Sequence, residues 1–359
     1  MPQPPTSTAI IGAGIAGLAC GQALRATGRP AHLFDKGRAP GGRMSSRRLP
    51  DAVVDLGAQF FSVRDPAFRH QVGAWQDAGH VATWPDALWQ VTETGWQRHR
   101  DGVERFIGTP RMSAVTRQLA EGLDVVTGTR IERLEAQDDQ WWLLDQHQLR
   151  HGPFARVVIA IPTPQAAALL VEHEPSLAEA CEAVTQRPCW AGWARFDAPL
   201  PSLPGVDDDW QAVRLDHDRM PAVEALRFAS RNDHKPGRHD QGESLSLLAR
   251  LEWSEAHLAL DAEAVARQLL EAFRERLPRG VTLPEPSDLG AHLWRYAQPD
   301  ICAAGEPINL DYRRSSTGLA LCGDGWRGPR VEDAWLSGHH LGEALAADTP
   351  GSLRDWRLP

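Results

Sequence analysis

The stretch Thr8–Gly21, which reads TAIIGAGIAGLACG, decides the fold. Its first four residues form a short apolar run, which is typical of a buried parallel strand. The apolar residues between positions 15 and 27 have helical spacing, and Gly28 is placed to end that helix. Three glycines in the pattern G-x-G-x-x-G join the expected strand to the expected helix.

Gly12, Gly14 and Gly17 meet three different physical needs. The first permits a tight turn, the second lets the backbone approach a phosphate, and the third lets the helix pack closely on the strand. The N–H groups of the first helical turn, from Ile15 onward, then face the phosphate. A second apolar run, Ala31–Asp35, ends in an acid that can accept hydrogen bonds from a ribose. The pattern predicts a dinucleotide-binding β-α-β unit; the alternative is a glycine-rich turn that only packs.

Two segments that follow favour FAD over NAD. Lys36–Met44 (KGRAPGGRM) carries a glycine pair and then Arg43, which could reach the same pyrophosphate. Asp55–Phe61 (DLGAQFF) comes next. Together they resemble the extended signature of FAD enzymes in the amine oxidase and phytoene desaturase superfamily. The resemblance implies cofactor contacts from Lys36 and Arg43, and from Ala58 and Gln59, where the chain runs past the flavin ring. The alternative for the second segment is an ordinary strand with paired aromatic residues.

A third piece lies near the C-terminus. Residues 318–322 form an apolar strand, and Asp324 follows between two glycines, where its carboxylate could accept from ribityl hydroxyls. A helix is expected from Val331 to about Ala346, with its positive end directed at the flavin N1 and C2 carbonyl edge. Both ends of the chain would hold one cofactor, which suits a resident, non-covalent FAD better than an NAD that leaves after each turnover.

Length and composition exclude several classes of protein. A chain of 359 residues predicts two domains, and a net charge of −9 disfavours nucleic acid as a partner. No apolar run is long enough for a membrane span, and the first residues lack the features of a signal peptide, so we expect a cytoplasmic protein. The five cysteines show no CxxC spacing, so neither disulfides nor a metal site is expected.

The predicted fold class is α/β. It comprises a Rossmann-like FAD-binding domain of the p-hydroxybenzoate hydroxylase and amine oxidase type and a discontinuous α+β substrate domain. We assign residues 1–68, 108–162 and 300–359 to the FAD-binding domain, and 69–107 and 163–299 to the substrate domain. The superfamily resemblance also implies that Ile131, at the start of an expected strand, lies beside the adenine. Further strands are expected at 123–126, 130–134, 156–162, 190–196 and 244–251, and helices at 112–120 and 261–277.

Several blocks along most of the chain are similar to the renalases, in particular the bacterial renalase-like flavoproteins. These blocks are GGRM, DLGAQFFSVRDPAFR, RNDHKPGR at 231–238, HLWRYAQP at 292–299 and GDGWRGPRVEDAWLSG at 323–338. The resemblance implies an FAD-dependent oxidase that returns the 2- and 6-dihydro isomers of NAD(P)H to NAD(P)+ while oxygen becomes hydrogen peroxide. The sequence departs from the family at Leu251–Ser254 and at Trp326, where substrate could be touched.

The lysine content bears on the substrate. Amine oxidases of this fold usually place a lysine near flavin N5, in the strand that corresponds here to Cys189–Phe196. The chain has only Lys36 and Lys235, and neither lies in that strand. Oxidation of a dihydronicotinamide needs no general base, because its product is already an aromatic cation, so no catalytic acid or base is assigned. The site must hold two rings together. The candidate residues for contact with substrate are Gln59, Phe60, Phe61, Asn232, His292, Trp294 and Tyr296.

The roles of two arginines and two alternative functions of the protein remain open. Arg238 and Arg295 could bind a substrate phosphate, or could pair with acids such as Asp233 and Asp300. The expected partners are a small-molecule substrate and O2. The alternatives are a flavin-containing amine oxidase, or a non-catalytic binding protein of the same fold, as in the Rab GDP-dissociation inhibitors. The intact glycines and acids of the cofactor motifs favour an enzyme.

Overall fold

A computed structural model of the chain describes residues 7–29, 31–207, 210–215, 224–238, 242–300 and 311–348. The chain divides into two compact units, each built from separate segments. The first contains Met1–Gly42, Thr116–Gln186 and Gln298–Pro359, and the second contains Arg43–Val115 and Arg187–Ala297. Within the described residues, no helix has both the length and the apolar composition of a membrane span.

The first unit is built on a six-stranded sheet with the order β10-β2-β1-β14-β21-β20. All its strands are parallel except β20, which pairs antiparallel with β21. Strand β1 pairs with a strand on each side, and its four residues are all buried, as its unbroken apolar run predicts. The bounds are β1 Thr8–Ile11, β2 Ala31–Asp35, β10 Asp124–Thr127, β14 Arg156–Ile159, β20 Tyr312–Arg314 and β21 Leu319–Cys322.

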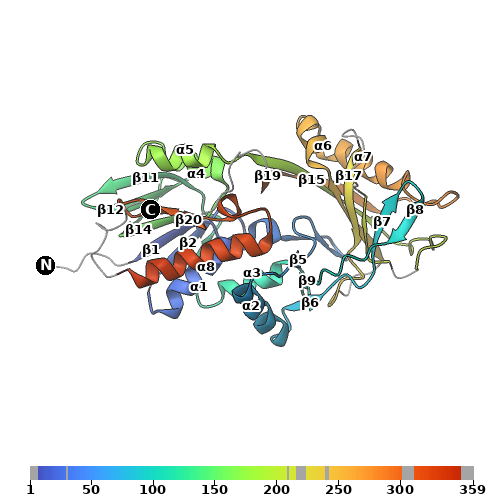
Figure 1. Ribbon diagram of the computed structural model, residues 1–359. Helices are drawn as coiled ribbons and strands as arrows, with labels where there is room; N and C mark the ends of the chain where they lie inside the picture. The colour runs from blue at the N-terminus through green and yellow to red at the C-terminus, as the bar shows by residue number, and fades with distance from the viewer. Residues whose placement is uncertain are drawn as a thin grey trace. The chain divides into compact units, whose positions relative to one another are not determined.

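Each face of this sheet is covered by other elements of the unit (Figure 1). Helices α1 and α8 lie side by side on one face. The opposite face packs against helices α4 and α5 and a three-stranded antiparallel sheet, β11-β12-β13, in one apolar cluster. The bounds are α1 Ile15–Ala26, α4 Thr163–Leu170, α5 Pro175–Glu182, α8 Val331–Ala347, β11 Ile131–Gln137, β12 Gln140–Asp145 and β13 Arg150–Phe154. The short 3-10 helix η3, Asp324–Trp326, precedes α8.

Glycines allow α1 and α8 to pack at very short range. A Cβ added at Gly338 would lie 1.9 Å from the Ala16 carbonyl oxygen, and one at Gly342 would lie 2.7 Å from that of Cys20. Real Cβ atoms do not approach a backbone oxygen this closely, so only glycine fits at these two positions of α8. The contact brings the helix from the C-terminal region against the helix that follows the first glycine motif.

The second unit contains a seven-stranded sheet with the order β19-β15-β18-β17-β16-β7-β8. Helix α7 covers one face of it, because Val265, Leu269 and Phe273 recur every four residues and are all 0% exposed. Asp261 caps the helix by accepting from the Ala264 N–H at 2.8 Å. The bounds are β7 Leu88–Thr92, β8 Gly95–Arg98, β15 Gln186–Phe196, β16 Ala212–Arg214, β17 Leu226–Arg231, β18 Glu243–Ala249, β19 Asp288–Pro299, α6 Leu251–Ala256 and α7 Ala262–Arg274.

Two smaller sheets complete the second unit, a hairpin β3-β4 and a sheet β5-β9-β6. Helix α2 begins with Asp65 as its cap and Pro66 in its first turn. Helix α3 continues from this unit into the first. The bounds are η1 Gly42–Met44, β3 Ser46–Arg48, β4 Val53–Asp55, β5 Phe61–Ser62, β6 Val81–Thr83, β9 Arg105–Gly108, α2 Pro66–Asp77 and α3 Ser113–Ala120.

The fold class agrees with the sequence prediction, but the compact units have other limits than the predicted domains. Residues 43–68 pack with the second unit, where β4 contacts β18. Residues 163–186 pack with the first unit, since α4 and α5 cover a face of its sheet. Compact units do not show which segments bind the cofactor, so the predicted limits of the FAD-binding domain stay a prediction.

Candidate functional site

The turn between β1 and α1 has the geometry of a phosphate cradle. Gly12 has φ +106°, and a Cβ there would lie 2.7 Å from the Ala160 carbonyl oxygen. A Cβ at Gly17 would lie 2.0 Å from the Gly12 carbonyl oxygen. Both positions therefore require glycine for packing. A Cβ at Gly14, by contrast, would meet nothing within 4 Å, so this glycine keeps open the side from which a phosphate would approach.

The start of α1 supplies the donors of this cradle. Gly14 caps the helix with extended backbone and no side-chain hydrogen bond, and the first turn contains no acid. The first N–H groups of a helix have no partner within it, and they carry its positive end. Helix starts of this kind can bind phosphate groups.

Asp35, at the end of β2, lies beside the same turn. Its Oδ2 accepts from the Ala13 N–H at 2.6 Å and its Oδ1 from the Gly37 N–H at 2.7 Å. Each carboxylate oxygen has a second lone pair, so both can also accept from a ribose hydroxyl. The chain before β11 passes here too, because the Thr129 N–H donates to the Asp35 carbonyl oxygen at 2.9 Å. Ile131 is the first residue of β11, and its side chain is 6% exposed and belongs to the apolar cluster that includes α4 and α5.

The C-terminal motif forms a second turn in the first unit. Gly323 has φ +135°, and its N–H donates to Ser337 Oγ at 2.8 Å, which ties the turn to α8. Asp324 follows and is 6% exposed. Val331 is the first residue of α8, and Asp333 in its first turn accepts from the Arg330 N–H at 3.2 Å and from Arg330 Nε at 2.8 Å. Because Glu332 and Asp333 are acids in that first turn, they offset part of the positive potential that the sequence analysis expects there.

The remaining residues predicted to bind the cofactor have mixed surroundings. Ile15 is 7% exposed at the start of α1, whereas Lys36 is exposed after β2. Arg43 and Ala58 belong to the second unit, where the Ala58 N–H donates to the Arg43 carbonyl oxygen at 3.0 Å. Arg43 Nη1 donates to the Ala297 carbonyl oxygen at 3.0 Å. Taken by itself, the first unit brings an open glycine, the N–H donors of a helix start and the Asp35 carboxylate together at one turn.

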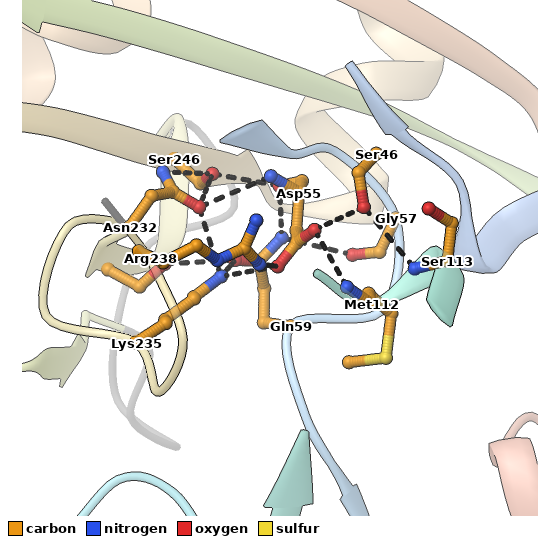
Figure 2. Close-up of polar contacts among 11 residues, drawn as sticks. Ser46, Asp55, Gly57, Gln59, Met112, Ser113, Asn232, Lys235, Arg238 and Ser246 are labelled. Atoms are coloured by element: carbon orange, nitrogen blue, oxygen red, sulfur yellow. Dashed lines mark hydrogen bonds and ion pairs between the residues drawn. The ribbon is translucent and has the colours of Figure 1, made fainter. Parts of the chain in front are cut away.

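The second unit contains a buried polar centre that the sequence analysis did not anticipate (Figure 2). The side chains of Asp55 and Lys235 are 0% exposed and that of Arg238 is 1% exposed. Asp55 Oδ2 lies 3.1 Å from Lys235 Nζ and 2.5 Å from Arg238 Nη2. Asp55 Oδ1 accepts from Ser46 Oγ at 2.6 Å. One carboxylate thus faces two cations in an environment without solvent.

The pKa values of Asp55 and Lys235 both lie below their usual values, but for different reasons. Burial alone would raise the pKa of Asp55, but Lys235 and Arg238 outweigh it, and the pKa lies below its usual value. Burial lowers the pKa of Lys235 to about 8, since the attraction of Asp55 offsets only part of that effect and Arg238 adds repulsion. The carboxylate is therefore held ionised, while the lysine can lose its proton in mildly alkaline solution.

Two residues predicted to contact substrate belong to this centre. Gln59 is 4% exposed; its Nε2 donates to the Asp55 carbonyl oxygen at 2.6 Å, and its Oε1 accepts from Lys235 Nζ at 3.0 Å and from Ser230 Oγ at 2.9 Å. Asn232 is 0% exposed, and its Oδ1 accepts from the Asp55 N–H and from Lys235 Nζ. The structure brings these two predicted residues together, with their amides engaged by protein groups.

The other predicted substrate residues lie on two further parts of the second unit. His292, Trp294 and Tyr296 alternate along β19 and so share one face of it. The rings of His292 and Trp294 meet edge to face at 4.5 Å, and Trp294 Nε1 donates to the Leu56 carbonyl oxygen at 2.8 Å. Phe60 is partly exposed, with its ring against Phe228.

Phe61 differs from Phe60, its neighbour in sequence. It is 3% exposed and packs between the rings of Phe68 and Phe106. The side chain of Phe61 is therefore part of a local aromatic core.

Arg238 pairs with Asp55, which is neither of the acids that the sequence analysis suggested for it. Its Nε and Nη1 are buried and have no partner among the described residues. Lys235 and Asp55 were not singled out from sequence as a pair, because 180 positions separate them. One signal was available: of 38 basic residues only two are lysines, so Lys235 is an unusual choice in a chain that otherwise uses arginine.

A neighbouring group of acidic and basic residues is explained by contacts within the protein. Asp233, His234 and Glu243 have side-chain atoms within 4.8 Å of one another. Arg231 Nη2 lies 2.6 Å from Glu243 Oε2, and His234 Nε2 lies 3.3 Å from Asp233 Oδ2. Because each carboxylate already has a basic partner, we assign no metal to this group.

Comparison with known proteins places these features in a wider context. Residues 10–74 match the model of the NAD(P)-binding Rossmann-like domain, and residues 75–341, more than half of the chain, match that of flavin containing amine oxidoreductases. A solved structure from Exiguobacterium sp. 255-15, provisionally named a protoporphyrinogen oxidase, has a TM-score of 0.71 at 14% identity, with 96% of this chain and 99% of that one covered.

Two further solved structures are similar over comparable lengths. Cyclohexylamine oxidase from Brevibacterium oxydans IH-35A has a TM-score of 0.70 at 14% identity, covering 96% of this chain and 99% of its own. Putrescine oxidase with putrescine bound has a TM-score of 0.64 at 14% identity, covering 97% and 99%. At such low identity these likenesses show the fold.

Proposed function

The chain belongs to the flavin containing amine oxidoreductase family, with FAD as its non-covalent cofactor, and from this premise we propose that it is a renalase-like oxidase of reduced nicotinamides. In this proposal the substrate is a 2- or 6-dihydro isomer of NAD(P)H, which loses a hydride and becomes NAD(P)+. When bound, FAD would supply the acceptor for that hydride, and O2 would take up the two electrons with two protons and leave as hydrogen peroxide.

The observation that carries the proposal is the position of the lysines. Strand β15 contains arginines but no lysine, so the lysine that amine oxidases of this fold usually hold near flavin N5 has no counterpart there. Of the two lysines, Lys36 is exposed in the first unit, and Lys235 is buried and paired with Asp55. A dihydronicotinamide needs no base to become an aromatic cation, so its oxidation is compatible with this arrangement. The blocks shared with bacterial renalases support the same substrate class.

In the proposed reaction the chain's own task is to bind and orient the substrate ring. Phe60, His292, Trp294 and Tyr296 are at least partly exposed in the second unit, and they are the residues we propose to touch it. Aromatic faces bind a nicotinamide ring by stacking and by excluding water. The buried Gln59, Phe61 and Asn232 would not touch the substrate; they would hold the segments that carry these aromatic residues in place. Hydride transfer requires reacting atoms about 3 to 3.5 Å apart, which demands such rigid support.

Anaerobic stopped-flow spectroscopy tests the proposal. The purified flavoprotein is mixed with 6-dihydro-NAD(P)H, 2-dihydro-NAD(P)H, ordinary 4-dihydro-NADH and a panel of amines, and the flavin absorbance near 450 nm is followed. We expect rapid bleaching by the 2- or 6-dihydro isomers and little by the 4-dihydro form. After admission of air, one hydrogen peroxide should form for each substrate molecule oxidised. Bleaching by amines alone would overturn the proposal.

A flavin-containing amine oxidase is the second candidate function. Its support is the description of the matching family, together with structural neighbours named cyclohexylamine oxidase and putrescine oxidase. Cyclohexylamine and putrescine are therefore the first amines of the panel. A preparation that stays colourless and ignores added FAD would instead favour the non-catalytic binding protein.

A further inference from the structure

Lys235 occupies a position that matches the donor capacity of a protonated amine. An ammonium group has three N–H donors and no acceptor. Lys235 Nζ lies 3.1 Å from Asp55 Oδ2, 3.0 Å from Gln59 Oε1 and 3.1 Å from Asn232 Oδ1. Each donor thus has one acceptor. A neutral amine has one donor fewer, so loss of the proton must release one of the three contacts.

The three acceptors belong to two segments of the second unit, residues 55–60 and the loop that follows β17. Asp55 and Gln59 bound the segment that leads to Phe60, and Asn232 begins the loop that carries Lys235. Within the first segment a Cβ at Gly57 would lie 1.8 Å from the Arg43 carbonyl oxygen, so the chain packs directly against the backbone of residue 43 there and leaves no room for a side chain. Ser246 Oγ donates to the Asp55 carbonyl oxygen at 2.8 Å, which adds strand β18 to the same network. Lys235 contacts Asp55, Gln59 and Asn232 at once (Figure 2).

The charges around Lys235 make its protonation sensitive to pH. Asp55 attracts the ammonium from the end of β4, and Asp233 attracts it from the same loop, while Arg238 repels it. The indole ring of Trp84 lies 5.1 Å from Nζ. Burial is the largest influence and lowers the pKa to about 8. The number of hydrogen bonds that Lys235 donates to Asp55, Gln59 and Asn232 can therefore change within the pH range in which the protein can be assayed.

We propose that Lys235 is a positioning residue which, from its buried site, fixes the amides of Gln59 and Asn232 and so holds segment 55–60 in the geometry that substrate oxidation requires. The inference rests on the proposed function in one respect, namely that Phe60 and its neighbours form a wall of the substrate site. It does not depend on which small reduced molecule is the substrate.

The first test compares variants of the holoenzyme. Lys235→Met keeps most of the side-chain volume and removes the charge, Lys235→Arg keeps the charge, and Arg267→Met is the control on the exposed face of α7. The measured quantity is the limiting rate constant of anaerobic flavin reduction at saturating substrate. We expect Lys235→Met to lower it by about tenfold to a hundredfold, the range that a misplaced reacting group produces. Flavin content is measured for each variant so that the rate constant is compared per bound flavin, and Lys235→Arg should recover part of the rate.

The second test uses the wild-type protein, so it decides the matter even if Lys235→Met does not fold. With only two lysines, 15N-lysine labelling gives two Nζ signals, and Lys36→Arg assigns them. The pH titration of the Lys235 signal is compared with the pH profile of the limiting reduction rate. We expect the rate to fall as that signal loses its proton, and the Lys235→Met profile, where it can be measured, to lack this step.

The outcomes separate this inference from the proposed function. If no dihydronicotinamide reduces the wild-type flavin, the proposed substrate is wrong, and the same comparison proceeds with whichever member of the panel does reduce it. If Lys235→Met matches Arg267→Met in rate and pH profile, or if the wild-type rate is flat across the Lys235 titration, the positioning role is refuted.

Discussion

Gly14→Ala should weaken FAD binding without damaging the fold. The backbone at Gly14, with φ −74° and ψ 177°, is accessible to alanine, and the added Cβ would meet no protein atom within 4 Å. The apoprotein should therefore change in stability by less than about 1 kcal/mol, the range between an alanine and a glycine at a helix N-cap. The new methyl group instead occupies the side of the turn from which the pyrophosphate would approach.

The size of the effect follows from overpacking. Forcing one extra methyl group into a close-packed contact costs about 1 to 3 kcal/mol, which corresponds to a dissociation constant raised by roughly fivefold to 150-fold. The assay is titration of each apoprotein with FAD, followed by quenching of flavin fluorescence, with urea unfolding of the same samples. Gly73→Ala is the matched control, because its Cβ also meets nothing within 4 Å but lies in α2 of the other unit.

A third variant calibrates the comparison. Gly17→Ala would place a Cβ 2.0 Å from the Gly12 carbonyl oxygen, so it should destabilise the apoprotein itself. If Gly14→Ala binds FAD as tightly as Gly73→Ala, the pyrophosphate does not pass Gly14, and our assignment of the cradle is wrong.

Three further results are expected. Gly338→Ala should lower the free energy of unfolding by about 1 to 3 kcal/mol in thermal or urea denaturation, because its Cβ would lie 1.9 Å from the Ala16 carbonyl oxygen; an unchanged midpoint would contradict the close packing of α1 and α8. The pKa of Lys235 falls from 10.5 to about 8 on folding, so the unfolded chain binds the extra proton between these values and stability should rise with pH there. Relative to Lys235→Met, urea unfolding of the wild type at pH 8 and 10.5 should show a gain approaching about 3 kcal/mol, and a loss would reverse the sign of our reasoning. Adding FAD to apoprotein at about 100 times its dissociation constant should raise the free energy of unfolding by about 2.7 kcal/mol, and a melting temperature that ignores FAD would argue against binding to the folded state.

Local sequence was sufficient for the nucleotide half of the protein. The strand, turn, helix and strand from Thr8 to Asp35 lie where the spacing predicts, Gly12 and Gly17 leave no room for a side chain, and Gly14 has open space beside it. The C-terminal strand, the turn at Asp324 and helix α8 also follow the prediction. These features can be read from sequence because a tight turn, an uncapped helix start and a buried strand are set by residues within a few positions of one another.

Contacts between distant segments could be known only from the tertiary structure. Nothing near Lys235 in sequence indicates that Asp55, 180 positions away, will neutralise part of its charge. By sequence the predicted substrate residues Gln59 and Asn232 are simply polar side chains within recognisable segments, and only packing shows that their amides serve a buried network. The energy of a buried charge depends on which partners surround it and how far water is excluded. Those quantities belong to the folded arrangement, whereas the sequence alone determined that the chain would build a dinucleotide cradle.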